Sequence, residues 1–342
     1  MTFKIKKNKK RVLFRADGNY KTGLGHVYRC LAIAERININ FECFFAIRAP
    51  SDKLKNELSK YSKVIILNQK RDYEEEVEKD LLSIIFNLKI DIITLDGYSF
   101  TTNYQKKIKQ LSKCYLISID DHQPYHYVSD MVINHAGGFD SNVISKENYT
   151  STFTGHNFLL LRKVFLKNLN ITRKFNGIHS VLICFGGSDY EDFTLSIFNC
   201  LKDKHTINRI SIIIGAAYLN KDMLLQSVRK YPQTEILENL NSEELSNIML
   251  KTDLAIVPSS TIGLEAFATK MIVITGATSN NQELIYNGLI NNITVTGVNF
   301  EKLNCKYLSD IINEISVKFS NYTIFSEKKI KDSILDLYKS IL

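Results

Sequence analysis

Short apolar runs alternate with amphipathic stretches along most of the chain. In the N-terminal half the apolar runs predict buried strands, and the stretches between them carry apolar residues at helical spacing. The predicted strands are 11–15, 41–47, 63–67, 91–95, 115–119 and 131–134. The predicted helices lie near 26–37, 51–60, 74–87 and 102–112. Apolar strands that alternate with helices favour a parallel sheet covered on both faces.

The same alternation starts again in the C-terminal half. Its predicted strands are 180–185, 209–214, 254–257 and 271–275, with 234–237 and 293–296 as further candidates. Its predicted helices lie near 191–202, 221–230, 242–251, 261–269 and 282–288. Two more helices, at about 301–317 and 326–341, have no predicted strand after them.

The two sets are separated by the polar, turn-prone stretch LNITRKFNG. We therefore predict two doubly wound, Rossmann-like α/β domains with a cleft between them. The predicted boundaries are 1–172 for the first domain, including a basic tail at 1–10, 173–325 for the second, and 326–342 for a closing helix. A chain of 342 residues has room for this, because domains of about 150 residues are common.

Composition places the chain among ordinary globular proteins. No apolar run approaches the ~18 residues of a membrane span, and the basic N-terminus lacks the apolar segment of a signal peptide. We expect a cytoplasmic protein without stable membrane insertion, and a monomer. The six cysteines form no CxxC pair, so we expect buried thiols rather than a disulfide framework or a metal site.

The net charge of +8 raises the possibility of a nucleic-acid partner. Much of this charge lies in the N-terminal tail, and such tails are usually solvated or loosely attracted to acidic surfaces. Aromatic residues are not interleaved with the lysines there, so we expect no nucleic-acid binding. A basic protein also suits an anionic nucleotide sugar. Charge alone does not decide between these partners.

One stretch, residues 11–37, combines a strand, a glycine loop and a helix start. The first turn of a helix has unpaired N–H groups and the positive end of the helix dipole, so it attracts anions. The glycines before it permit close approach of a ligand. The loop is not a Walker A motif, because Leu24 stands where a lysine is required. It is not a dinucleotide fingerprint either, because Tyr28 occupies the third glycine position.

FRADG (14–18) followed by GLGHVYRCLAIA (23–34) resembles the start of the UDP-sugar hydrolases of pseudaminic acid biosynthesis. Those enzymes are relatives of the glycosyltransferase that makes lipid II. The resemblance continues in order along most of the chain, through LDGY (95–98), IDDH (119–122), SDMVIN (129–134), FLLLR (158–162), CFGGSDYEDFT (184–194), SSTIGLEA (259–266) and NNQELIYNGL (280–289).

The resemblance implies a GT-B fold, in which the last helix (326–342) packs back on the first domain. It also implies a hydrolase that removes UDP from a UDP-linked diacetamido-trideoxyhexose. His26 would activate a water that attacks the anomeric carbon with inversion, without a metal or another cofactor. A histidine suits this role because it accepts a proton near neutral pH. A lone histidine here could also only cap or pack the helix start. The alternative function is a glycosyltransferase of the same fold, in surface polysaccharide synthesis, whose His26 deprotonates a sugar hydroxyl.

In the first domain the resemblance implies substrate contacts at the ends of strands and at the helix start. Asp96 and Tyr98 end a predicted strand, although Gly97 replaces the side chain that the family usually carries between them. Asp17 either orients His26, binds a sugar hydroxyl or only closes its own turn. The expected substrate-binding residues are Asp17, Gly25, Arg29, Asp96 and Tyr98.

In the second domain the resemblance implies a uridine diphosphate site. The helix that starts at Ser260 and Thr261 would cradle the diphosphate, and Glu265 would hold the ribose hydroxyls. The expected nucleotide-binding residues are Gly186, Gly187, Ser188, Ser260, Thr261, Glu265, Asn281 and Gln282. Without the resemblance, these residues read as a tight turn, a helix cap and the start of the next helix. We interpret Asp120-Asp121-His122 as a sheet-end loop that lines the cleft rather than as a metal site, because neighbouring strand residues face opposite ways.

Overall fold

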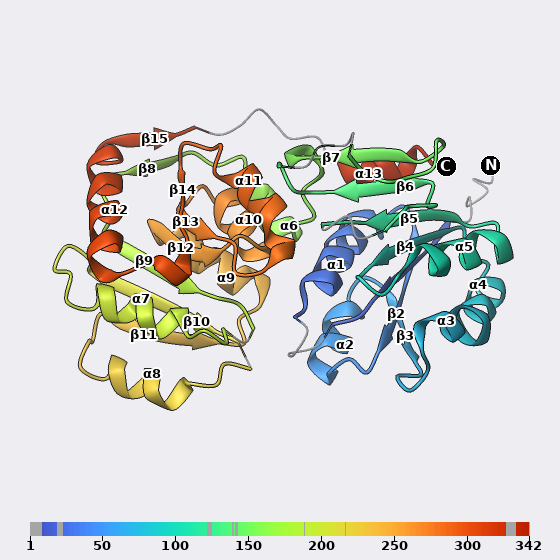
Figure 1. The fold of residues 1–342 in the computed structure, drawn as a ribbon, viewed down its shortest axis with the longest axis horizontal. Coiled ribbons are helices and arrows are strands. Elements are labelled where there is room, and N and C mark those ends of the chain that lie inside the picture. The colour runs from blue at the N-terminus through green and yellow to red at the C-terminus, as the bar shows by residue number, and fades with distance from the viewer. Residues whose placement is uncertain are drawn as a thin grey trace, which may run out of the picture.

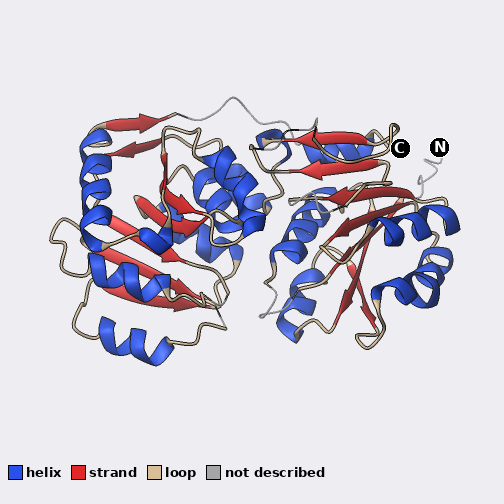
Figure 2. Cartoon of the chain, in the orientation of Figure 1, coloured by secondary structure: helices blue, strands red, loops and turns tan. Residues whose placement is uncertain are grey.

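The computed structural model describes residues 9–18, 23–121, 125–138, 140, 143–187, 189–215, 217–325 and 333–341. The described chain forms two α/β units, each built around its own parallel sheet (Figure 1). Figure 2 shows the helices that pack on these sheets. The predicted fold class, two doubly wound Rossmann-like domains, is confirmed.

The first sheet has seven parallel strands in the order β3-β2-β1-β4-β5-β6-β7. Its inner strands are buried on both faces, which is why they read as continuous apolar runs. The strands are β1 (Arg11–Ala16), β2 (Glu42–Arg48), β3 (Lys63–Leu67), β4 (Ile92–Asp96), β5 (Tyr115–Ile119), β6 (Met131–Asn134) and β7 (Ser151–Thr154). The helices are α1 (Gly25–Ile37), α2 (Asp52–Leu58), α3 (Tyr73–Glu76), the π-helical η1 (Val77–Leu81), α4 (Leu82–Asn87) and α5 (Thr102–Leu111).

The second sheet has six parallel strands in the order β11-β10-β9-β12-β13-β14. They are β9 (Ser180–Cys184), β10 (Arg209–Ile214), β11 (Thr234–Glu238), β12 (Leu254–Pro258), β13 (Ile272–Gly276) and β14 (Val295–Gly297). The helical elements are α7 (Phe193–Leu201), α8 (Lys221–Val228), α9 (Ser242–Leu250), α10 (Thr261–Ala268), η3 (Asn280–Gln282), α11 (Glu283–Leu289), η4 (Phe300–Lys302) and α12 (Cys305–Lys318).

Each sheet has a point where the strand order reverses, and ligands of doubly wound proteins gather at such points. In the first sheet the reversal lies between β1 and β4, and in the second between β9 and β12. Loops that leave these four strands lead to His26, Tyr98, Gly186 and Ser260. The topology therefore directs most of the predicted site residues toward the carboxyl edges of the two sheets.

A connecting segment joins the two units. It contains η2 (His156–Phe158) and α6 (Lys163–Asn168), and α6 packs against both α1 and α10. A short strand, β8 (Arg173–Phe175), then pairs antiparallel with β15 (Tyr322–Ile324). The last helix, α13 (Ser333–Lys339), returns to the first unit and packs against α1, and the Tyr338 hydroxyl lies 2.6 Å from the Thr94 hydroxyl. Figure 1 shows α13, in red, among the elements of the first unit.

Our expectation that all cysteines are thiols is wrong for two of them. Cys200 on α7 and Cys305 at the start of α12 form a disulfide across a sequence separation of 105 residues. Each of these positions is isolated in the sequence, so no spacing indicated that the two meet. Cys30, Cys43, Cys114 and Cys184 are buried free thiols.

No helix within the described residues is both long and apolar enough to cross a bilayer. The same residues bring together no group of three or more His, Cys, Asp or Glu side chains that could hold a metal ion.

Candidate active site

His26 is the second residue of α1 and lies beside the carboxyl end of β4. Its Nδ1 is 2.7 Å from an oxygen of Asp96, the last residue of that strand. β1 and β4 pair in parallel, and Ala16 at the end of β1 lies opposite Asp96. Asp96 is fully buried, whereas the His26 side chain is 19% exposed. A buried carboxylate thus holds a histidine whose ring reaches solvent.

Arg29 lies one turn after His26 and completes this cluster. Its guanidinium donates to both Asp96 oxygens, at 2.9 and 2.6 Å, and to Asp121. Burial alone would lower the pKa of Arg29, but the charges of Asp121 and Asp96 outweigh it and raise that pKa well above its usual value. Arg29 therefore stays a cation that neutralises part of the buried negative charge.

Two contacts meet at His26 Nδ1, and the role of this nitrogen in them depends on the tautomer of the ring. Arg29 Nη2 also lies 2.7 Å from His26 Nδ1, but a single Nδ1 cannot both donate to Asp96 and accept from Arg29. The Asp96 carboxylate can only accept a hydrogen bond, so the His26–Asp96 contact is a hydrogen bond when the ring carries its proton on Nδ1. In that tautomer the outer nitrogen, Nε2, is unprotonated and can act as a base.

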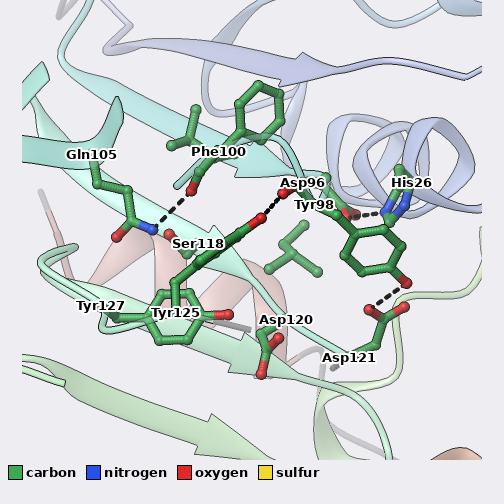
Figure 3. Close-up of a pocket in the computed structure, with 13 residues that line it drawn as sticks. His26, Asp96, Tyr98, Phe100, Gln105, Ser118, Asp120, Asp121, Tyr125 and Tyr127 are labelled. Carbon is green, nitrogen blue, oxygen red and sulfur yellow. Dashed lines mark hydrogen bonds and ion pairs between the residues drawn. The ribbon is translucent and has the colours of Figure 1, made fainter. Parts of the chain in front are cut away.

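Tyr98, drawn beside His26 and Asp121 in Figure 3, also contacts Asn281 of the second unit. Its ring meets the His26 ring edge-on, with centroids 4.6 Å apart. Its hydroxyl donates to Asp121 at 2.9 Å and accepts from the Asn281 amide at 2.8 Å. Burial raises the pKa of Tyr98, so the hydroxyl remains protonated at neutral pH.

The cluster opens on a cleft of about 530 Å³ that lies between the two units. This volume is in the range of small-molecule sites. From the first unit it is lined by Gly23, Gly25, His26, Arg29, Tyr98 and Asp121. From the second it is lined by Phe185, Asp189, Tyr190, Glu191, Phe193, Ser260, Thr261, Thr278, Ser279, Asn281, Gln282 and Ile285. A much smaller cavity, of about 20 Å³, lies behind His26 among the residues drawn in Figure 3.

The two helix starts of the second unit differ in their capacity to bind an anion. At α7 the amides of Phe193 and Thr194 are taken by the Asp189 carboxylate, at 3.1 and 2.9 Å. At α10, in the part of the chain that the structure describes, no side chain caps the first turn. Since Ser260 and Thr261 line the cleft, the start of α10 presents amide groups and a positive dipole end to it.

Of the predicted site residues, Gly25, His26, Arg29, Tyr98, Ser260, Thr261, Asn281 and Gln282 line the cleft, and Asp96 lines the smaller cavity. Gly186 and Gly187 do not line it, although Phe185 and Asp189 on either side do. Gly186 has a φ of 81°, which explains a glycine in that turn. Ser188 lies outside the described residues.

Two predicted residues are engaged elsewhere. The described contacts of the Asp17 carboxylate are with the Arg15 side chain, the Tyr73 hydroxyl and the Arg48 amide, and His26 is not among them. These donors lower the pKa of Asp17 despite its burial, which raises it. Glu265 is buried and accepts from Arg162, which the sequence analysis did not identify. Asp121 was expected only to line the cleft, and its contact with Arg29 had no signal in the sequence.

Solved structures define the class of fold. Acinetobacter baumannii MurG superposes with a TM-score of 0.63 at 10% identity, covering 97% of this chain and 99% of that one. A glycosyltransferase from Rickettsia africae gives 0.59 at 15% identity, covering 98% and 99%. Anabaena HepE, solved with UDP and glucose, gives 0.57 at 12% identity, covering 96% and 94%. These likenesses establish a GT-B fold.

Particular relatives are found among curated proteins, while no family model matches the chain. An uncharacterized protein of Methanocaldococcus jannaschii is 26% identical over 84% of this chain, which spans 60% of that protein's length. The spore coat polysaccharide biosynthesis protein SpsG of Bacillus subtilis is 23% identical over 71% of this chain and 70% of its own. A UDP-2,4-diacetamido-2,4,6-trideoxy-beta-L-altropyranose hydrolase of Campylobacter jejuni is 23% identical over 76% and 89%.

Proposed function

We propose that this protein hydrolyses a UDP-linked diacetamido-trideoxyhexose by attack of water on the anomeric carbon. The observation that carries the proposal is the His26–Asp96 pair, whose histidine lines a cleft that also receives the uncapped start of α10. The name of the Campylobacter jejuni relative supplies the reaction and the sugar.

In the proposed reaction, His26 Nε2 accepts a proton from water while the water oxygen bonds to C1 of the sugar. The C1–O bond breaks on the opposite face, and its electron pair leaves with UDP, so the configuration inverts. Asp96 stabilises the imidazolium that forms, and Arg29 fixes the Asp96 carboxylate. The start of α10 stabilises the charge of the leaving diphosphate with amide groups and its dipole.

The nucleotide site of this proposal comprises the α10 start with Asn281 and Gln282. Glu265, expected at the ribose, is buried and accepts from Arg162 through one carboxylate oxygen, and its contact with the ribose remains a prediction. The Asn281 amide also donates to the Tyr98 hydroxyl at 2.8 Å, and the Tyr98 ring contacts the His26 ring. The proposed nucleotide site therefore lies next to the side chains around His26.

A glycosyltransferase in polysaccharide synthesis is the second candidate, because the fold is shared with a solved glycosyltransferase and the relative SpsG is named for spore coat polysaccharide biosynthesis. The same His26 would then deprotonate a sugar hydroxyl instead of water. The two functions differ in whether an acceptor is needed. A hydrolase releases UDP from the donor alone, and a transferase does so only poorly.

The decisive experiment is turnover of the candidate UDP-sugar in ¹⁸O-water. Label in the released sugar supports attack at carbon, whereas label in UDP means attack at phosphorus and a different mechanism. His26→Ala should abolish turnover and leave UDP affinity, measured by calorimetry, nearly unchanged. Asp96→Asn should lower kcat by about 10²–10⁴-fold, the usual contribution of general base catalysis.

The control is His126→Ala, because this partly exposed histidine of the same unit contacts Ser145 and Glu147 and does not line the cleft. It should keep normal activity. If His26→Ala also keeps near-normal turnover, His26 is structural and the proposed mechanism is wrong.

A further inference from the structure

Arg162 lies between the two helices that carry the proposed chemistry. It directly precedes α6 in the connecting segment, residues 156–169, and its side chain is 14% exposed. Its Nε and Nη2 donate to the same oxygen of Glu265, at 3.1 and 2.7 Å. Glu265 lies on α10, one turn after Thr261 and buried beneath the helix start that faces the cleft.

The other side of Arg162 meets α1. Its guanidinium carbon lies 5.2 Å from the centre of the Tyr28 ring, and Tyr28 is only two residues after His26. A cation over the face of an aromatic ring is attracted by the ring's quadrupole. The Tyr28 hydroxyl in turn donates to Glu57 at 3.3 Å. One side chain therefore contacts both the histidine-bearing helix and the helix that faces the proposed diphosphate.

The rest of the connecting segment is fixed to both units. Toward α1, the Arg36 guanidinium donates to the Leu159 carbonyl at 2.8 Å, and the Lys163 amide donates to Glu35 at 2.8 Å. Toward the second unit, the Asn168 amide donates to Ser246 at 2.8 Å. Arg162 lies between these attachments. A displacement of α1 relative to α10 would therefore disturb its contact with Tyr28 or its contact with Glu265.

The ion pair of Arg162 and Glu265 places two opposite charges in a largely buried position. Burial raises the pKa of Glu265, and Arg162 opposes that rise by its charge and its hydrogen bonds. Burial lowers the pKa of Arg162, but Glu265 outweighs it and the net shift is upward. Removal of one partner leaves the other charge buried and uncompensated, so the geometry of the pair is maintained by both residues.

We propose that Arg162 is a positioning residue that fixes the distance between His26 and the start of α10. This inference rests on the proposed function, because that distance matters only if both groups act on one substrate. Misplacement of a reacting group by about 1 Å can cost 10²-fold in rate.

The test measures turnover and UDP binding separately. Arg162→Met should lower kcat by about 10–10²-fold with UDP affinity unchanged, and Arg162→Lys, which keeps the charge, should recover part of the loss. The double variant Arg162→Met/Glu265→Gln removes the unpaired charge and should fold normally, yet show the same loss of kcat. The matched control is Arg173→Lys, because Arg173 is also partly buried and, among the described residues, its guanidinium donates to carbonyls of the second unit.

A readout without turnover separates this inference from the proposed function. In protein with ¹³C-labelled histidine, UDP should shift the His26 resonance, and Arg162→Met should weaken that shift while calorimetry still detects binding. An equal shift in wild type and variant overturns the inference, even if UDP-sugar is never turned over. A loss of kcat in Arg173→Lys as large as in Arg162→Met overturns it as well, because the effect would then be general destabilisation.

Discussion

Asp96 shows how much of a site depends on single residues that are distant in sequence. It is 70 residues away from His26, yet its carboxylate lies 2.7 Å from Nδ1 of the His26 ring. The sequence predicted both residues at strand or helix ends, which parallel topology brings to one edge. It did not predict their pairing, and it offered Asp17 as the partner instead. The choice depends on side-chain directions after β1 and β4, which spacing along the chain does not encode.

His135, directly after β6, is a second residue with an unusual environment. It is fully buried, and neither ring nitrogen has a hydrogen-bond partner among the described residues. Burial, and next the charge of Arg29, lower its pKa to about 3, against opposing effects of Asp121 and Asp96. His156 acts in the same direction as Arg29. The residue is therefore neutral in the folded protein throughout the neutral and weakly acidic range.

This environment makes stability depend on pH. Between about pH 6.5 and 3 the unfolded chain binds a proton at residue 135 that the folded protein does not, so stability rises with pH in this window. The contribution is complete above pH 6.5 and lost as the pH falls toward 3. From pH 7.5 to 5.5 it should cost about 1.4 kcal/mol of unfolding free energy. Urea denaturation of wild type and His135→Leu at both pH values measures the difference, which should be smaller in the variant by about 1.4 kcal/mol. A variant that keeps the full wild-type difference contradicts the assignment, and His126→Gln is the control that should keep it.

At the scale of elements, apolar patterns predicted the buried strands well because those strands have no exposed face. The strands β7, β8 and β15 were missed, since they are short and largely half-buried and carry no continuous apolar run. The predicted helix at 74–87 is interrupted by the π-helical η1, which follows the buried Glu76. Glu76 accepts from Arg15 and Arg48, a buried arrangement that helical periodicity does not indicate.

Asp189 caps the start of α7, whereas the start of α10 lacks a side-chain cap. A carboxylate introduced at the start of α10 should therefore raise the stability of the free protein and lower its affinity for UDP. Thr261→Asp places a carboxylate at the uncapped start of α10, so it should stabilise the free protein by about 0.3–1 kcal/mol through the helix dipole. The same carboxylate repels a diphosphate at that position, so UDP affinity should fall by at least about tenfold, or 1.4 kcal/mol. Thermal unfolding and calorimetry measure the two effects.

The control for this prediction is Asn304→Asp at the exposed start of α12. Asn304 already caps that helix and does not line the cleft, so the added charge should leave UDP affinity unchanged. If Thr261→Asp binds UDP as tightly as wild type, the diphosphate is not at the start of α10.

At the scale of the whole molecule, two segments link the two units: the connecting segment and the C-terminal helix α13. The connecting segment contacts α1 and α10, and α13 returns from the end of the second unit to the core of the first. The alternation of strands and helices predicted two sheets, and the resemblance predicted that the last helix returns. Neither the alternation nor the resemblance predicted which side chains join the units. Arg162, Tyr28 and Asn281 lie in elements whose apolar patterns indicate burial within one domain and do not indicate contacts between domains.

Tyr338 tests whether α13 belongs energetically to the first unit. It is fully buried among residues of β1, α1 and β2, and its hydroxyl meets Thr94 on β4. Tyr338→Ala should therefore cost about 3–5 kcal/mol, the range for large aromatic truncations, and Tyr338→Phe only about 1 kcal/mol for the lost hydrogen bond. The chain has no tryptophan, so far-UV circular dichroism is the suitable probe.

In Tyr338→Ala we expect the first unit to unfold before the second, which gives two transitions where we expect one in wild type. UDP at about 100 times its Kd should raise only the later transition, by about 2.7 kcal/mol, because the proposed nucleotide site lies on α10 and η3 of the second unit. A single transition that UDP shifts as a whole would show that the two units unfold together and that α13 stabilises both.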